Sequence, residues 1–272
     1  MRCSRASRQQ LRPRLAPEAI SVATRNRSVR TLPCLFDSTD KPGAFSCFSS
    51  SNQMMSRSQL KIILLVAVFA ASFAFVESSV VVYLRQIYYP EGFSFPLKPA
   101  LMSHLAVELV REFATIVMLV AVGMIAGKSR WARFSYFLVG FGVWDIFFYV
   151  WLKIILNWPA SLLDWDILFL IPIPWIGPVL APVLVSVMMI AGGVLILSKE
   201  EREGRFSASA LSVIMTLLGS ALVLLSFMLD TDAGLRFQYP RPYHYELLLL
   251  GMLCYGMALV QTMRRSGNYG RR

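Results

Sequence analysis

Residues 60–84 read LKIILLVAVFAASFAFVESSVVVYL, and the only charged side chains in this run are Lys61 and Glu77. A bilayer core about 30 Å thick is crossed by about 20 consecutive apolar residues in an α-helix. Five further apolar runs of comparable length follow. The six predicted spans cover residues 60–84, 103–126, 134–156, 178–197, 208–228 and 245–263. We therefore predict an all-α protein, a polytopic bundle of six transmembrane helices.

The composition of the chain agrees with this class. Hydrophobic residues make up 56% of the 272 residues and charged residues only 16%, whereas soluble domains have about 45–50% and about 25%. The excess of apolar residues gathers into long runs instead of spreading along the chain as a soluble core requires. An integral membrane protein with the lipid bilayer as its surroundings follows from that distribution.

Residues 1–58 form a basic leader that precedes the six-helix domain of residues 59–272. The leader carries ten Lys or Arg and three acids, is rich in Ser, and has no sustained apolar period. We expect it to be disordered. Two interpretations stay open: an organellar transit peptide of this composition, or a true start at Met54 or Met55, where a short basic flank leads into the first span.

Basic residues alternate between the two sides of the predicted bundle. One set of ends and connections holds Arg57, Lys61, Lys128, Arg130, Arg133, Lys199, Arg202, Arg205, Arg264, Arg265, Arg271 and Arg272. The other set holds only Arg85, Lys98, Arg236 and Arg241. The positive-inside rule then places both termini in the cytoplasm, in a bacterial plasma membrane, or in an organellar membrane if the leader is a transit peptide. The net charge of +11 lies in these flanks and in the leader, which argues against nucleic acid as a partner.

The connection between the third and fourth spans is unusually apolar. Residues 157–182 read NWPASLLDWDILFLIPIPWIGPVLAP, with five prolines that disfavour a helix interior. We expect an interfacial segment or a partial re-entrant lid on the outer side, with Trp158, Trp165 and Trp175 near the lipid headgroups. A simple aromatic belt is the alternative.

Several ionisable residues fall inside the predicted spans, where each costs about 2.5–3.5 kcal/mol on insertion scales. They are Glu77, Glu108, Arg111, Glu112, Asp145, Lys153 and Glu246. At about 100° per residue, His104, Glu108, Arg111, Glu112 and Thr115 share one stripe of the second span, and Gly142, Asp145, Tyr149 and Lys153 share a face of the third. We expect these stripes to face each other, with Arg111 meeting Asp145 or a glutamate.

The acids group between the midplane and the outer surface of the predicted bundle. This predicts a polar site open to the extracytoplasmic side and covered by Asp164, Trp165 and Asp166. The predicted ligand- or ion-binding residues are Glu77, Glu108, Arg111, Glu112, Asp145 and Tyr149. Crowded carboxylates do not all ionise cheaply, so some are expected to hold protons. The leading hypothesis is therefore binding or transport of a cation, a proton-coupled solute or a lipid headgroup.

Two alternatives stay open. An intramembrane hydrolase acting on lipid would use a carboxylate pair, or a metal held by His104, Glu108 and Glu112. A structural ion-pair network would use Arg111 and Lys153 to neutralise acids and would bind no ligand. The motifs HExxH, GxSxG, GxxxxGK[ST] and CxxCH are absent from the chain, so the sequence predicts no particular cofactor. Ser209, Ser212, Thr216, Ser220 and the pair Gly192–Gly193 are expected to be packing faces.

Overall fold

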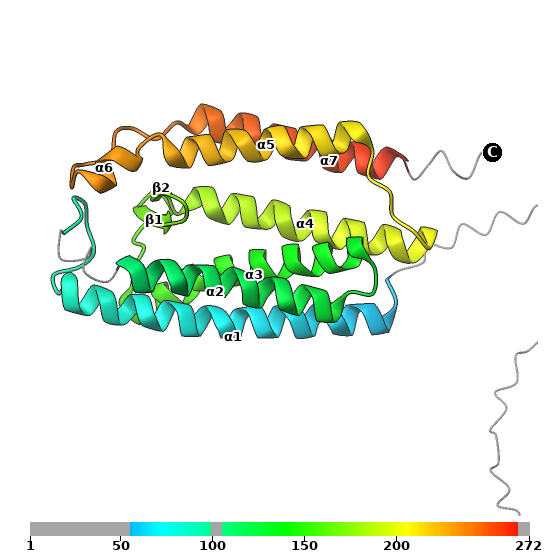
Figure 1. The fold of residues 1–272 in the computed structure, drawn as a ribbon, viewed down its shortest axis with the longest axis horizontal. Coiled ribbons are helices and arrows are strands. Elements are labelled where there is room, and N and C mark those ends of the chain that lie inside the picture. The colour runs from blue at the N-terminus through cyan, green and yellow to red at the C-terminus, as the bar shows by residue number, and fades with distance from the viewer. Residues whose placement is uncertain (1–54, 99–104, 266–272) are drawn as a thin grey trace, which may run out of the picture. The chain divides into compact units, whose positions relative to one another are not determined.

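The computed structural model describes residues 55–98 and 105–265. Most of the predicted leader and the candidate ligand His104 lie outside these residues. The elements in chain order are α1 (Arg57–Tyr88), α2 (Leu105–Ala126), α3 (Arg130–Leu156), β1 (Trp165–Phe169), β2 (Trp175–Pro178), α4 (Leu180–Glu203), α5 (Ala210–Met228), α6 (Thr231–Leu235) and α7 (Tyr245–Arg265) (Figure 1). Six helices are long and apolar enough to cross a membrane, namely α1 to α4, α5 together with α6, and α7. The predicted helical membrane bundle is confirmed at this level.

The helices extend beyond the apolar runs because they end at caps and not where hydropathy falls. The fourth span, predicted to end at residue 197, continues through Glu203 and stops at Gly204, whose φ of 71° is left-handed. The third begins four residues early at Arg130, where the Ser129 hydroxyl accepts a hydrogen bond from the Ala132 amide at 2.9 Å. Glycine and serine at such positions are typical helix caps.

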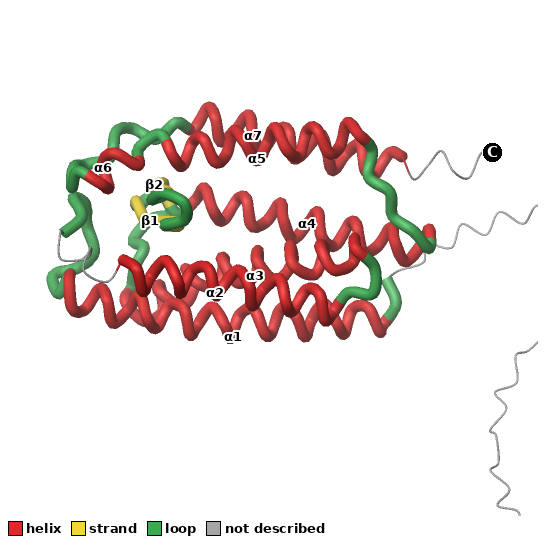
Figure 2. The backbone as a smooth tube through the Cα atoms, viewed as in Figure 1, coloured by secondary structure: helices red, strands yellow, loops and turns green. Residues whose placement is uncertain are grey.

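The helices form two groups that are visible in the tube view (Figure 2). In the first group α3 packs against α1, α2 and α4, and in the second α5 packs against α7. A Cβ atom added to Gly142 of α3 would lie 2.6 Å from the Ser186 carbonyl oxygen of α4, and one added to Gly193 would lie 2.7 Å from the Ser135 carbonyl oxygen. Small residues therefore let the α3 and α4 backbones approach closely.

The predicted packing faces have different roles in the structure. Gly193 is a tight contact, but a Cβ atom at Gly192 would meet only Leu259, at an ordinary 3.7 Å. On α5, the Thr216 and Ser220 hydroxyls donate to carbonyl oxygens one turn earlier in the same helix. The close contact between α5 and α7 is instead made by Gly219, where an added Cβ would lie 2.9 Å from the Gly251 carbonyl oxygen.

The apolar connection between α3 and α4 folds into an antiparallel hairpin of β1 and β2. Trp165 pairs with Pro178 and Ile167 with Ile176, and the register shifts between Ile167 and Phe169. Ile176 is fully buried. The sequence predicts an irregular segment here, because the run of apolar residues and prolines masks the alternation of a strand.

Two of the three tryptophans of this connection pack against the second helix group. Trp175 stacks on Phe227 with ring centroids 6.1 Å apart, and Trp165 meets Tyr243 edge-on at the same distance. Both tryptophans therefore contribute to a core cluster that includes α5 and α7 residues. The hairpin is consequently an internal element that joins the two helix groups.

The two ends of the bundle differ in charge. The start of α1, the α2–α3 and α4–α5 connections and the end of α7 lie at one end, here called the cationic end; the hairpin, α6 and the end of α1 lie at the other, here called the hairpin end (Figure 1). The alternation of basic residues in the sequence thus becomes a separation in space.

Candidate functional site

Arg111 of α2 is the centre of a partly buried ion-pair cluster at the hairpin end. Its guanidinium pairs with the Glu77 carboxylate of α1 and lies 2.8 Å from the Glu108 carboxylate, one turn earlier on its own helix. Glu77 is only 4% exposed, and it also accepts a hydrogen bond of 2.7 Å from the Thr115 hydroxyl. The polar stripe of α2 therefore turns toward α1.

The prediction that Arg111 pairs with a residue across its contact with α3 is wrong. Arg111 meets a glutamate, as one form of the prediction had it, but that glutamate belongs to α1 and not to α3. Asp145 of α3 instead accepts a hydrogen bond of 2.8 Å from the Ser186 hydroxyl of α4. The close approach of α3 to α4 at Gly142, one turn before Asp145, brings Ser186 within this distance.

Two carboxylates, Glu112 of α2 and Asp166 of β1, connect the hairpin to the helices around the site. Glu112 accepts a hydrogen bond of 2.8 Å from the Leu170 amide, directly after β1. Asp166 on β1 forms a buried ion pair with Arg85 of α1 at 2.9 Å, and the Tyr149 side chain hydrogen-bonds to Asp166. The predicted lid residues thus include one that reaches into the bundle.

Arg85 is a residue of the candidate site that the sequence did not predict, because its charge was assigned to a connection between spans. It is 7% exposed, and its guanidinium carbon lies 3.7 Å from the centre of the Trp158 ring and 4.2 Å from that of Phe93. An arginine held between aromatic faces gains a cation–π attraction in addition to its ion pair. A signal was available in the aspartates Asp164 and Asp166, which lie in the otherwise apolar connection after the third span.

The environment of Asp166 favours its neutral form. Burial raises the pKa of Asp166 from 3.8 to about 6, although Arg85, the Ile167 amide and Tyr149 each oppose the rise. Removal of water destabilises the charged carboxylate more than the neutral acid. Asp166 therefore titrates nearer to physiological pH than an exposed aspartate.

A cavity of about 30 Å³ lies where these helices and the hairpin meet. Its polar lining comes from Glu77, Arg111, Glu112, Thr115, Asp145 and Tyr149, and its apolar walls from Trp144, Phe148, Leu168 and Phe169. Five of the six predicted site residues thus surround one cavity, and the sixth, Glu108, joins them through Arg111. A water molecule needs about 10–15 Å³ of such space, so the cavity suits one or two waters or a small cation.

Two charged residues of the predicted spans lie away from this cavity, near the ends of their helices. Lys153 is exposed and donates to the carbonyl oxygens of Asn157 and Pro159 beyond the end of α3, at 3.3 and 2.9 Å. Glu246 is exposed at the start of α7 and pairs with His244 at 2.7 Å. The proposed neutralising role of Lys153 is therefore wrong, since Arg85 and Arg111 are the cations of the site.

Over residues 55–98 and 105–265, no group of three or more His, Cys, Asp or Glu side chains is arranged to hold a metal ion. The metal site suggested by His104, Glu108 and Glu112 depends on a residue outside the described part. No family model, no curated protein sequence and no solved structure matches this chain. The fold therefore supports one class, an integral membrane protein with six apolar helices.

Proposed function

We propose that this protein is a proton-coupled membrane transporter whose proton-binding site is the carboxylate cluster, which we define as Glu77, Glu108, Glu112, Asp145 and Asp166. The observation that carries the proposal is the imbalance of charge in the site. Five carboxyl groups lie around only two guanidinium groups, those of Arg85 and Arg111. Full ionisation would leave a net charge of −3 at this end of the bundle.

Such a surplus is costly away from water. A buried group that lacks a counter-charge neutralises instead of paying the full cost of desolvation. Two of the acids accept hydrogen bonds from neutral donors, the Leu170 and Ile171 amides for Glu112 and the Ser186 hydroxyl for Asp145. The charge of Arg111 also acts on Glu112, but its ion pairs are with Glu77 and Glu108. These two carboxyl groups are therefore the best candidates to take up and release protons.

The volume of the cavity limits which ligands it can hold. About 30 Å³ admits water and protons but no lipid headgroup or organic solute. A proton-exchanging site is thus favoured over the binding of a larger cationic solute in this cavity. It is also favoured over a lipid hydrolase at this position, because a substrate ester would need space beside the carboxylates.

We further propose that both termini face the cytoplasm, so that the hairpin end faces the extracytoplasmic side. The segregation of basic residues at the cationic end supports this orientation. A bacterial plasma membrane fits it, as does an organellar membrane if the leader is a transit peptide.

Cysteine labelling tests this orientation. In a background in which all four native cysteines are replaced, single cysteines are introduced at Lys128 and at Asp164. A membrane-impermeant maleimide applied to intact cells should label only the cysteine at position 164. Labelling of Lys128→Cys alone would show the opposite orientation, with both termini on the extracytoplasmic side.

Proton flux in proteoliposomes tests the proposed activity. With an enclosed pH-sensitive dye and an imposed pH gradient, Glu112→Gln and Asp145→Asn should each reduce flux at least about tenfold, a change of about 1.4 kcal/mol in the barrier. Both substitutions keep the shape and a hydrogen-bond acceptor. Glu246→Gln is the matched control, since Glu246 lies at the same end but is exposed. If both variants fold and conduct protons as the wild type does, the cluster has a structural role and does not carry protons.

A further inference from the structure

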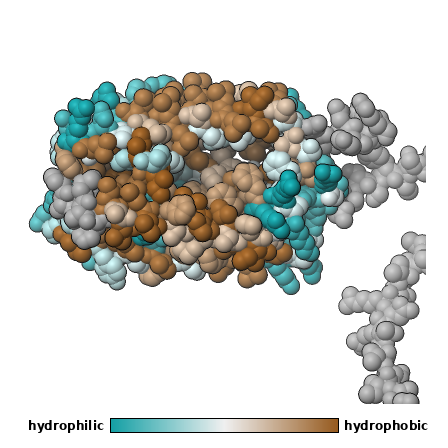
Figure 3. All heavy atoms as spheres, in the orientation of Figure 1, coloured by the Kyte–Doolittle hydropathy of each residue, from teal (hydrophilic) through white to brown (hydrophobic). Residues whose placement is uncertain are grey.

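A second cavity system lies away from the carboxylate cluster, between the two helix groups. Its inner part is a cleft of about 520 Å³ with walls from α3, α4, α5 and α7. Apolar side chains dominate the lining, among them Leu138, Met188, Leu195, Val213 and Leu259. Figure 3 shows this face of the molecule hollowed between the layers, with hydrophobic residues on both sides. The volume lies within the range of about 300–1,000 Å³ typical of ligand sites.

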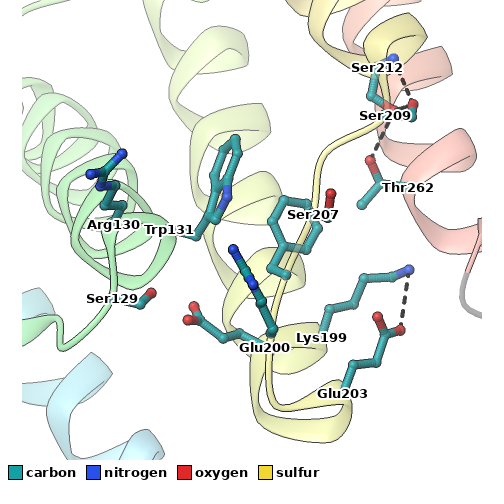
Figure 4. A pocket seen from close by; sticks show the side chains of 12 residues that line it. Ser129, Arg130, Trp131, Lys199, Glu200, Glu203, Ser207, Ser209, Ser212 and Thr262 are labelled. Carbon is teal, nitrogen blue, oxygen red and sulfur yellow. Dashed lines mark hydrogen bonds and ion pairs between the residues drawn. The ribbon is translucent and has the colours of Figure 1, made fainter.

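The cleft continues into a polar mouth at the cationic end. A cavity of about 1080 Å³ there shares Trp131, Phe206, Ser212 and Thr262 with the cleft. Its lining adds three basic residues, Arg130, Lys199 and Arg205, two glutamates, Glu200 and Glu203, and several hydroxyl groups (Figure 4). The apolar cleft and the charged mouth therefore adjoin at four shared residues.

At the mouth, one buried lysine forms a long ion pair, and one buried carboxylate oxygen lacks a hydrogen-bond partner among the described residues. Lys199 is only 7% exposed, yet its ammonium lies 3.9 Å from the Glu203 carboxylate, beyond hydrogen-bond distance. The Glu200 Oε2 atom is buried and has no hydrogen-bond partner among the described residues. The long distance to Glu203 leaves room for a closer anion beside the Lys199 ammonium, and the buried Glu200 oxygen can accept from a hydrogen-bond donor.

We infer that this space binds one glycerophospholipid, with an acyl chain in the cleft and its phosphate at the mouth. The apolar lining suits hydrocarbon, and Arg130, Lys199 and Arg205 suit a phosphate. Glu200 suits a headgroup that carries a donor, which an ethanolamine ammonium or a glycerol hydroxyl supplies and a choline does not.

Matched variants separate the two halves of the inferred site. Gly192→Leu should fill the cleft, because Gly192 lines it and an added Cβ meets only Leu259 at 3.7 Å. Gly256→Leu adds the same side chain to α7 at a position with nothing within 4 Å. Lys199→Met removes the buried charge and keeps the length, and Lys128→Met does the same at an exposed position of the same end.

Native mass spectrometry of the detergent-solubilised full chain, titrated with phosphatidylethanolamine, phosphatidylglycerol or phosphatidylcholine, tests the inference. We expect one retained molecule of the first two lipids and at least about tenfold weaker retention of phosphatidylcholine. Gly192→Leu and Lys199→Met should lower retention about tenfold, while the controls retain lipid as the wild type does. Equal retention of all three lipids by the wild type, or unchanged retention in both cleft and mouth variants with wild-type melting curves, would overturn the inference. The inference would also be overturned if, in the absence of lipid, a second copy of the chain or the chain's own leader covered the cleft.

Discussion

Arg85 near the end of α1 donates to the Asp166 carboxylate of β1 at 2.9 Å. This contact fixes the hairpin against the first helix, and the hairpin in turn supplies the Leu170 amide that holds Glu112. The geometry of the carboxylate cluster therefore depends on a segment that lies outside the transmembrane helices. Changes in the ion pair are expected to reach the cluster through the hairpin.

The first prediction concerns the pH dependence of stability at Asp166. Its pKa is raised from 3.8 to about 6 by burial, so between these values the folded protein holds a proton that the unfolded chain has lost. The contribution of Asp166 to the free energy of unfolding must then fall as the pH rises through this window. Thermal melting of the wild type and of Asp166→Asn, compared from pH 4 to pH 7, measures it.

We expect the wild type to lose stability relative to Asp166→Asn as the pH rises from about 4 to about 6, since asparagine does not titrate. Asp164→Asn is the control. Asp164 is two residues away from Asp166, and its side chain accepts a hydrogen bond from the Ala160 amide at a turn. A constant difference between wild type and Asp166→Asn across the window would contradict the assignment.

The second prediction concerns Arg111. Arg111→Met leaves the Glu77 and Glu108 carboxylates without the guanidinium that pairs with both. Removal of one partner of a buried ion pair costs about 3–5 kcal/mol, so we expect a large fall in the midpoint of chemical or thermal unfolding. Arg236→Met is the matched control: Arg236 and Asp232 are 68% and 70% exposed, and its loss should change stability by less than about 0.5 kcal/mol.

A double variant separates charge from packing at this pair. Glu77→Gln in the Arg111→Met background removes the uncompensated carboxylate, so part of the lost stability should return. The interaction free energy from the double-mutant cycle is expected to be about 1–3 kcal/mol. Additive effects of the two substitutions would show that Glu77 and Arg111 are not coupled.

The third prediction concerns the contact between α3 and α4. Gly142→Ala places a methyl group 2.6 Å from the Ser186 carbonyl oxygen, which is backbone and cannot move without the helix. We expect a loss of about 1–3 kcal/mol, as for other overpacked sites, and a weaker bond between Ser186 and Asp145. Gly192→Ala on α4 should be neutral or stabilising by up to about 1 kcal/mol, because its new contact is an ordinary one. Equal effects in the melting curves of both variants would contradict this account.

Much of the fold was predictable from the sequence. Runs of about 20 apolar residues specify spanning helices because the bilayer core sets the required length. The boundaries were less accurate, since helix α4 continues through a charged segment to Gly204. The hairpin was not predicted as strands, because β1 and β2 are short and, apart from Asp166, apolar on both faces, which removes the alternation by which a half-buried strand is recognised.

The helical period brought most of the site residues onto the correct faces, but it did not identify their partners. Which helix lies opposite a stripe depends on contacts such as those of Gly142, and these are set by the whole bundle. Arg85 and Asp166 were not predicted as a pair because they are far apart in the sequence and each is next to a presumed interface. Lys153 and Glu246 do not join the site, because both lie near helix ends where their side chains are exposed, and hydropathy alone does not show this.

Infrared difference spectroscopy tests the central claim most directly, because the carbonyl stretch of a protonated carboxylic acid is separate from the bands of a carboxylate. In a titration of the purified protein around neutral pH, the account predicts protonated-carboxyl bands that titrate, and that Glu112→Gln and Asp145→Asn each remove one, while Glu246→Gln leaves the spectrum unchanged. A wild-type spectrum with every carboxyl ionised throughout, in protein that remains folded, would contradict the account.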